Sequence, residues 1–248
     1  MLAGLTGPGP LATLPAMGEE STKVRRWTKS PTAEPEKRLL VWIAARTPRW
    51  LVPDHLSVLG LLAAVWIGVA YGLSARSPAW LWGASAGLVV HWLGDSLDGT
   101  LARVRHIERP RYGFYVDHLG DAVATVAIGL GLGLSPYMLL AVGLTIVVGY
   151  LLLSLNVYLE TLVVQQFRLG YGILGPTEVR ILLILLNTLA LGLGPIPFRA
   201  GGVRATVFDV VGVLTAFGML AMLLRRIIRN LRHLSRLEPP NVVKPPTS

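Results

Sequence analysis

The chain has 248 residues, with 23 Lys and Arg, 14 Asp and Glu, no Cys and a formal net charge of +9. Only 15% of the residues are charged, against about a quarter in ordinary soluble domains, while 52% are hydrophobic. This composition argues against a soluble globular enzyme and excludes intrinsic disorder for most of the chain. A sequence without Cys also excludes a disulfide scaffold and any chemistry that uses Cys as a metal ligand or nucleophile.

The N-terminal region is predicted to contain two parts. Residues 1–33 are rich in Gly, Pro, Ser and Thr, which predicts a disordered segment; no long apolar stretch follows an initial basic region, so it does not resemble a signal peptide. In residues 34–49, apolar and basic side chains alternate at helical spacing, which predicts a juxtamembrane amphipathic helix on the membrane surface. A solvent-facing linker helix is the alternative, but Trp42 and Trp50 are typical of the membrane interface.

Six apolar segments follow this helix, most of them near the roughly 20 residues that a helix needs to cross a bilayer. The third contains Gly129, Gly131 and Gly133, a pattern that favours close packing between membrane helices. We therefore expect an all-α membrane protein whose six-helix domain covers residues 50–228 and precedes a basic C-terminal tail at 229–248. The six segments are 56–75, 78–95, 112–134, 137–159, 179–194 and 205–224.

Lys and Arg are distributed unequally between the two sides of this arrangement. Eight precede the first span, four lie in the second-to-third link, two in the fourth-to-fifth link and six in the C-terminal tail, whereas three lie on the opposite side. The positive-inside rule then places both termini in the cytoplasm. Basic residues near membrane boundaries are typical of contact with anionic headgroups, so the lipid bilayer is the expected partner and nucleic acid is not. We expect a multi-pass protein of the cell membrane.

Four of the six aspartates lie within 27 residues: Asp95, Asp98, Asp117 and Asp121. Residues three or four apart share one face of a helix, so the first two project together near the end of the second span. The other two project together one to two turns into the third span. Because the link between these spans is short, we expect the two faces to converge at the cytoplasmic edge of the bilayer.

Converging carboxylates repel one another, and placing one at membrane depth costs about 2.5–3.5 kcal/mol even on a lenient scale. Oxygen ligands without Cys favour Mg²⁺ or Mn²⁺, and four carboxylates suit two such ions, which can clamp a diphosphate. The alternative is a set of caps and interfacial charges paired with basic residues of the link. Two acids inside an apolar span argue against it, since intramembrane acids are usually functional. The basic residues in question are Arg103, Arg105, Arg109 and Arg111.

The segment between the two acidic pairs completes a longer motif. Residues 95–121 read D-S-L-D-G-T-L-A-R, then nine residues, then G-F-Y-V-D-H-L-G-D. This resembles the signature of the CDP-alcohol phosphatidyltransferase family, D-x2-D-G-x2-A-R-x8–9-G-x3-D-x3-D, at all eight specified positions. The spacer of nine residues, where eight is commoner, affects the path of the loop and leaves the helix faces unchanged.

The resemblance implies an integral membrane enzyme of phospholipid synthesis, with a surface helix, six spans, cytoplasmic termini and a homodimeric assembly. In this family, a hydroxyl group of one substrate attacks the β-phosphorus of a CDP-linked substrate, and CMP leaves. Carried over by position, Asp95, Asp98 and Asp117 would hold the metal ions, while Asp121 would act as the general base or complete the second metal shell. The likeness covers about residues 36–228 and is specific only within the signature.

The remaining signature positions are expected to form the CDP-binding pocket: Gly99, Ala102, Arg103 and Gly113. Glycine and alanine let a ligand approach the backbone closely, and Arg can donate two parallel hydrogen bonds to a phosphate. The first span starts with W-L-V-P-D-H-L-S, where family members often have Asn after the Pro. Asp54 stands there instead, so no contact as a hydrogen-bond donor is assigned to it.

The acceptor site is the least specific part of the prediction. Arg168 and Arg180, in the cytoplasmic link after the fourth span, are candidates to contact an anionic acceptor headgroup; the alternative is an interfacial anchor. His118 is expected to pack rather than to bind a hard cation, and His91 to hydrogen-bond Asp95.

The sequence leaves two alternatives open beside the main expectation. CDP-diacylglycerol is the expected donor, with a polar alcohol as acceptor. The alternative is transfer from CDP-choline or CDP-ethanolamine to diacylglycerol, which the run G-D-S-L-D-G also resembles. A more distant alternative is an ion or proton transporter. Two observations argue against it: the acids gather at one membrane edge, and no inverted repeat is visible.

Overall fold

The computed structural model describes residues 33–164, 175–194, 197–200 and 202–238. Over these residues the chain is helical, which confirms the predicted class. Of the segment 1–33 that is predicted to be disordered, residues 1–32 lie outside the described residues and Ala33 begins α1; residues 239–248 of the predicted tail also lie outside them. The elements are α1 (Ala33–Arg46), α2 (Pro53–Leu73), α3 (Trp80–Val104), α4 (Pro110–Gly133), α5 (Leu140–Val164), α6 (Pro176–Leu193), β1 (Phe198–Ala200), β2 (Val203–Ala205) and α7 (Val207–Leu237).

The all-α prediction missed the short hairpin between α6 and α7. Strands β1 and β2 pair antiparallel, with Arg199 opposite Arg204. The chain between them carries the Gly pair 201–202, and Gly202 has a φ of 85°, a backbone conformation that glycine adopts without strain. The predicted sixth span at 205–224 therefore begins at the last residue of β2, two residues before α7 starts at Val207. Helix α7 continues beyond the predicted span to Leu237.

Four of the described helices, α2, α5, α6 and α7, are long and apolar enough to cross a membrane. Helices α3 and α4 are of similar length, at 25 and 24 residues, but carry the signature acids and several Arg residues. The membrane character predicted from composition is thus supported by the structure for these four helices, which do not include α3 and α4.

The second apolar segment was predicted to end at residue 95, but its helix continues to Val104. The end of α3 is set by His106, whose φ of 56° is left-handed and whose N–H bonds back to the carbonyl of Arg103. Asp95 and Asp98 therefore lie within a continuous helix. The link from α3 to α4 is correspondingly short, since α4 begins at Pro110.

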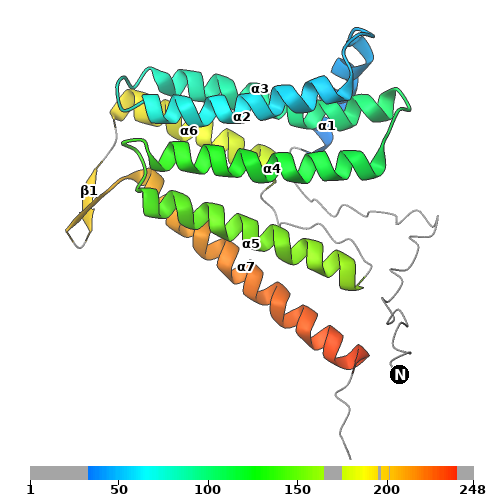
Figure 1. The fold of residues 1–248 in the computed structure, drawn as a ribbon. Coiled ribbons are helices and arrows are strands. Elements are labelled where there is room, and N and C mark those ends of the chain that lie inside the picture. The colour runs from blue at the N-terminus through cyan, green and yellow to red at the C-terminus, as the bar shows by residue number, and fades with distance from the viewer. Residues whose placement is uncertain (1–32, 165–174, 195–196, 201, 239–248) are drawn as a thin grey trace, which may run out of the picture.

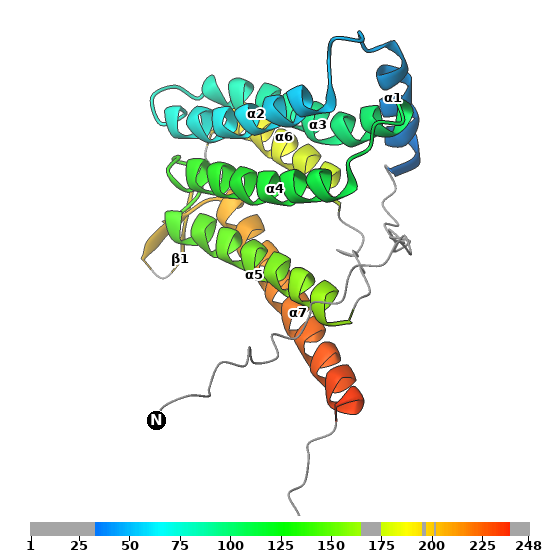
Figure 2. The same ribbon diagram turned by 45° about the vertical axis from the view of Figure 1, so that its right-hand side comes forward.

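The helices form two groups in space. Helices α2, α3, α4 and α6 lie side by side, and α1 lies across the end where α3 finishes and α4 begins (Figures 1 and 2). Helix α2 packs against α3 and α4, and α6 packs against α3. Helices α5 and α7 form a pair that meets α4 near its C-terminus and diverges from it toward the C-terminal end of α7 (Figure 2).

Glycines allow α2 to approach both of its neighbours closely. A Cβ on Gly94 of α3 would lie 2.6 Å from the backbone nitrogen of Gly60 in α2. A Cβ on Gly131 of α4 would lie 2.3 Å from the Cα of Gly68, which confirms the close packing predicted for this glycine run. These contacts fix the spacing of α3 and α4, the two helices that carry the signature, on a common neighbour.

We expect Gly94→Ala to destabilise the protein by roughly 1–3 kcal/mol, because the new methyl group meets backbone atoms that cannot move aside. The measurement is thermal unfolding of the detergent-solubilised protein. Gly72→Ala in α2 is the matched control, since a Cβ there has no neighbour within 4 Å, and its unfolding temperature should stay the same or rise slightly. Equal losses in the two variants would contradict the close packing of α2 and α3.

Candidate active site

The signature acids of α3 and α4 lie within electrostatic range of one another. The charges of Asp95 and Asp117 act on Asp98 and also on Asp121, so acids from both helices influence the same groups. Asp98 is only partly exposed, and the side chain of Asp95 is 24% exposed. Two helices that are neighbours of α2 thus bring four like charges into one partly buried region.

Asp98 is held by α2 and by its own helix. The hydroxyl of Ser57 donates a hydrogen bond of 2.6 Å to Oδ2 of Asp98, and the backbone N–H of Gly99 donates one of 2.5 Å to Oδ1. Ser57 lies at the start of α2, in the run that follows the family-like W-L-V-P. No role is predicted for this serine, because nothing in its spacing shows that it faces a residue 41 positions away.

Asp95 is paired with a cation from α6. Nη2 of Arg180 donates a hydrogen bond of 2.6 Å to Oδ2 of Asp95, and the Arg180 side chain is 11% exposed. The same guanidinium nitrogen lies 3.3 Å from Nε2 of His91. Arg180 also acts electrostatically on Asp121, so it supplies positive charge to acids of both helices. One of the two predicted acceptor residues therefore lies at the acidic cluster, while Arg168 lies outside the described residues.

The predicted hydrogen bond between His91 and Asp95 is not among the contacts of the described residues; His91 has other partners. Its Nδ1 lies 3.0 Å from the carbonyl oxygen of Gly60, a hydrogen bond in which Nδ1–H donates, and this leaves Nε2 to accept from Arg180. The expectation failed because the ring is buried between α2 and α3 and its Nδ1 is taken by the α2 backbone. His91 therefore contacts the cation that binds Asp95.

On α4, Asp121 receives a hydrogen bond from the side chain of Tyr150, which comes from α5. Asp117 is more exposed, at 41% of its side chain. His118 lies beside it but bonds the carbonyl of Phe114 through Nδ1 at 2.8 Å and stacks on the Phe114 ring at 4.1 Å. His118 thus packs against Phe114 and against the ring of Tyr158 in α5, as its predicted packing role requires. Tyr150 was missed, since only the packing of α5 on α4 reveals it.

The predicted CDP-binding residues lie along the last turns of α3 and the start of α4. The guanidinium of Arg103 donates a hydrogen bond of 3.1 Å to Thr100 and lies over Gly99, where a Cβ would be 3.3 Å from its Nη1. A Cβ on Gly113 would have no neighbour within 4 Å, so the backbone of α4 is open there. Ala102 is half-buried on the same helical segment as Arg103.

Two basic residues of the link have partners away from the acidic cluster. Arg105 donates hydrogen bonds to the carbonyls of Thr47, Pro48 and Leu51, which joins the end of α3 to the link between α1 and α2. Arg109 forms an ion pair with Asp54, and this hydrogen bond raises the pKa of the guanidinium. The alternative in which the signature acids serve only as partners for the link is therefore not supported at these two positions.

The donor set of the cluster fits a hard divalent cation. Its side chains offer carboxylate oxygens only, and Arg180 pairs with Asp95 and acts electrostatically on Asp121. Within the described part of the chain, no three His, Asp or Glu side chains already lie close enough to form a metal site. The carboxylates would thus have to move closer together, as like charges do when a cation lies between them.

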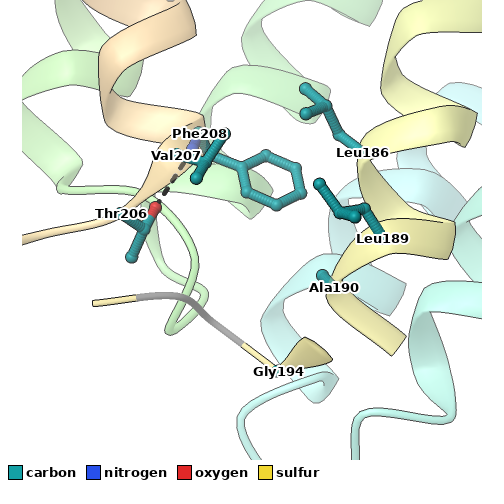
Figure 3. A pocket seen from close by; sticks show the side chains of 7 residues that line it. All are labelled: Leu186, Leu189, Ala190, Gly194, Thr206, Val207 and Phe208. Atoms are coloured by element: carbon teal, nitrogen blue, oxygen red, sulfur yellow. Dashed lines mark hydrogen bonds between the residues drawn. The ribbon is translucent and has the colours of Figure 1, made fainter. Parts of the chain in front are cut away.

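Two cavities of the described residues lie away from the signature acids. A pocket of about 10 Å³ is lined by Leu186, Leu189 and Ala190 of α6, Gly194, and Thr206 to Phe208 at the start of α7 (Figure 3). It has room for about one water molecule, and it lies at the end of α6 remote from Arg180. A groove of about 460 Å³ between α5 and α7 is almost entirely apolar. Neither is lined by a signature residue.

With this arrangement established, comparison with known proteins is informative. The family model for CDP-alcohol phosphatidyltransferase matches residues 50–225, which include the whole signature and all helices from α2 to most of α7. The chain belongs to this family. The resemblance deduced from eight signature positions is thereby confirmed over most of the chain.

Three curated members of the CDP-alcohol phosphatidyltransferase family are similar to this chain. Cholinephosphotransferase 1 of Danio rerio is 27% identical over 226 residues, or 85% of this chain and 57% of the relative. Cholinephosphotransferase 1 of Gallus gallus is 27% identical over 70% of this chain and 54% of the relative, and that of Xenopus laevis is 26% identical over 70% and 45%. The chain thus spans about half the length of these relatives.

Proposed function

We propose that the protein transfers a substituted phosphate group from a CDP-linked donor to the hydroxyl of an alcohol or lipid acceptor, releasing CMP, in phospholipid biosynthesis. The observation that carries the proposal is the electrostatic proximity of the signature acids of α3 and α4, with Arg180 paired to Asp95 and acting on Asp121. A membrane protein gains no stability from four adjacent carboxylates, since each costs free energy to bury. Membership of the family supports the same reaction class.

The proposed topology has six spans, with α3 and α4 added to the four apolar helices. Both are long enough to cross a bilayer, and both pack against α2. Helix α1 exposes Leu39, Val41 and Trp42, which supports its placement on the membrane surface. The excess of Lys and Arg supports cytoplasmic termini and an active site at the cytoplasmic face of the cell membrane. We take residues 50–228 as the catalytic domain.

In the proposed mechanism, the acceptor hydroxyl oxygen forms a bond to the β-phosphorus of the donor. The bond between this phosphorus and the oxygen that bridges the two phosphates breaks, and its electron pair leaves with CMP. Asp121 accepts the hydroxyl proton, and the hydrogen bond from Tyr150 holds its carboxyl group in place from α5. Ser57 and the N–H of Gly99 hold Asp98 in the same way.

The donor's diphosphate carries negative charge that repels an incoming oxygen, so positive charge is needed beside it. Two Mg²⁺ or Mn²⁺ ions held by Asp95, Asp98, Asp117 and Asp121 would neutralise that charge. Arg103, which lies over Gly99, is proposed to donate two hydrogen bonds to a phosphate, and Gly113 leaves the backbone of α4 open to the nucleotide. Arg180 is proposed to contact the anionic group of a charged polar-alcohol acceptor; diacylglycerol, the acceptor in the alternative form of the reaction, has no such group. By analogy with the family, we propose a homodimer.

We expect Asp98→Asn and Asp121→Asn each to lower CMP release by at least 100-fold, because each variant loses a charge that the mechanism uses. The assay measures CMP formed by the protein in membranes with Mg²⁺ or Mn²⁺. Arg236→Ala, at an exposed position near the end of α7, is the control and should keep its activity within twofold. Substantial turnover by either Asp variant would contradict the assignment.

In the form of the reaction with an anionic polar alcohol as acceptor, we expect Arg180→Ala to raise the acceptor KM by about tenfold or more, with a smaller change in kcat, because a cation that meets the acceptor's anionic group is lost. Arg180→Lys keeps the charge but not the planar guanidinium, so its acceptor KM should lie between those of the parent and of Arg180→Ala. The measurement is initial-rate kinetics at saturating donor. An unchanged acceptor KM in the Ala variant would contradict this role.

The choice of donor distinguishes two forms of the proposed reaction. In the first, CDP-diacylglycerol is the donor and a polar alcohol the acceptor. In the second, CDP-choline or CDP-ethanolamine is the donor and diacylglycerol the acceptor, and the relatives named cholinephosphotransferase favour this form.

Membranes that contain the protein should therefore release CMP with one donor class and not the other. We expect labelled choline to appear in lipid if the second form is correct, and labelled diacylglycerol phosphate to appear in a new headgroup class if the first is. Membranes with the Asp98→Asn variant provide the background. No product with either donor class, at normal levels of folded protein, would contradict the proposed function.

A further inference from the structure

Glu36 joins three helices through side-chain hydrogen bonds. It lies in the first turn of α1, and its Oε1 accepts a hydrogen bond of 2.6 Å from Nε1 of Trp92 and a longer one of 3.5 Å from Ser96, both on α3. The hydroxyl of Thr177 on α6 lies 3.0 and 3.1 Å from the two carboxylate oxygens. A half-buried carboxylate is thus bound by three neutral donors from two other helices.

These donors lie directly beside the Asp95–Arg180 ion pair. Trp92 is three residues before Asp95 and shares its face of α3. Thr177 is three residues before Arg180 and shares its face of α6. The interface of α3 and α6 is therefore tied twice at neighbouring levels, once directly through Arg180 and Asp95 and once through Glu36 of α1.

We propose that Glu36 is a positioning residue that holds the N-terminal turn of α6 against α3 and thereby keeps Arg180 directed at the acidic cluster. The proposal deepens the proposed function and rests on it, since Arg180 is taken to act on the acceptor. Glu36 itself has no contact with the signature acids among its hydrogen bonds; it acts through Trp92, Thr177 and the helices that carry them.

The need for a second tie follows from what Asp95 is proposed to do. A cation bound by Asp95 competes with Arg180 for the same carboxylate, and the direct link between α3 and α6 then weakens. The Glu36 bridge does not involve Asp95 and remains intact. Hydrogen bonds to a charged group are stronger than those between neutral groups, so the bridge can keep α6 in place.

Packing supports the placement of α1 that this bridge requires. Leu40 and Ala44 of α1 are buried against Leu56 of α2 and Leu97 and Leu101 of α3. Helix α1 is therefore fixed on the bundle by an apolar face, and Glu36 lies one turn before Leu40, where it reaches across to α6.

The sequence offers a matched control. Glu34 lies in the same first turn of α1, carries the same charge and is exposed, whereas Glu36 is half-buried. Replacing either residue by Ala removes one negative charge from the same turn and changes helix propensity equally. A difference between Glu34→Ala and Glu36→Ala therefore reports on the contacts of Glu36.

The first test is kinetic. Glu36→Ala should raise the acceptor KM about tenfold, in the same direction as Arg180→Ala, while Glu34→Ala stays within twofold of the parent. Glu36→Gln, which keeps one carbonyl acceptor and the volume, should lie in between and covers the case in which Glu36→Ala does not fold. In the double variant Glu36→Ala/Arg180→Ala, the Glu36 change should add less than twofold, because both act through one group. Full additivity would overturn the proposal.

The second test does not depend on activity. Because the chain has no Cys, Leu39→Cys and Val179→Cys introduce two spin labels at exposed positions of α1 and α6 in an otherwise label-free protein. Electron paramagnetic resonance should give one narrow distance distribution in the parent and in Glu34→Ala, and a longer, broader one in Glu36→Ala. An unchanged distribution in Glu36→Ala would overturn the bridge. If the parent releases no CMP with any donor, the proposed function fails, and the label distances still decide whether Glu36 holds α6.

Discussion

The mutual repulsion of the four signature carboxylates is the constraint on which the rest of this structure depends. The backbone places them on two helices that both pack tightly on α2, so the charges cannot separate without disrupting the contacts of Gly60 and Gly68. Arg180, Ser57 and Tyr150 then hold individual carboxylates from three further directions, α6, α2 and α5. Close helix packing supplies the force that keeps like charges together, and hydrogen bonds orient them.

The sequence predicted the parts of the site that depend on local spacing. Asp95 with Asp98, and Asp117 with Asp121, share helix faces because residues three or four apart always do, and the short α3–α4 link brings the pairs together. Ser57, Tyr150 and Glu36 were missed for a physical reason. Their partners lie 29 to 141 residues away, and such contacts depend on which helices pack and at what rotation, which no single-sequence period specifies. The hairpin at 198–205 was missed because two three-residue strands give no apolar alternation.

The pair α5–α7 is tied together by a separate set of charges. Glu160 of α5 is buried and receives hydrogen bonds from Arg226 at 3.2 Å and from Arg229 at 2.9 Å, both on α7. Two of the six basic residues counted in the C-terminal region, where contact with anionic headgroups is expected, therefore bind an acid within the protein. Because Glu160 lies on the same helix as Tyr150, this pairing also fixes the helix that bonds Asp121.

Helix α6 turns polar side chains inward and apolar side chains outward, the reverse of a helix in a soluble protein. This arrangement explains how it serves the site. Thr177, Arg180 and Asn187 lie at spacings of three and seven residues and so share one face. That face points inward: Asn187 is fully buried, accepts a hydrogen bond from Tyr71 and donates one to Ser85. The other face exposes apolar residues, as expected where the surroundings are lipid (Val179, Ile181, Leu182, Leu185 and Leu189). Polar contacts therefore fix the rotation of α6 at two levels along its length. With its rotation fixed at Asn187 and at Thr177, Arg180 has no freedom to turn outward when Asp95 binds another partner.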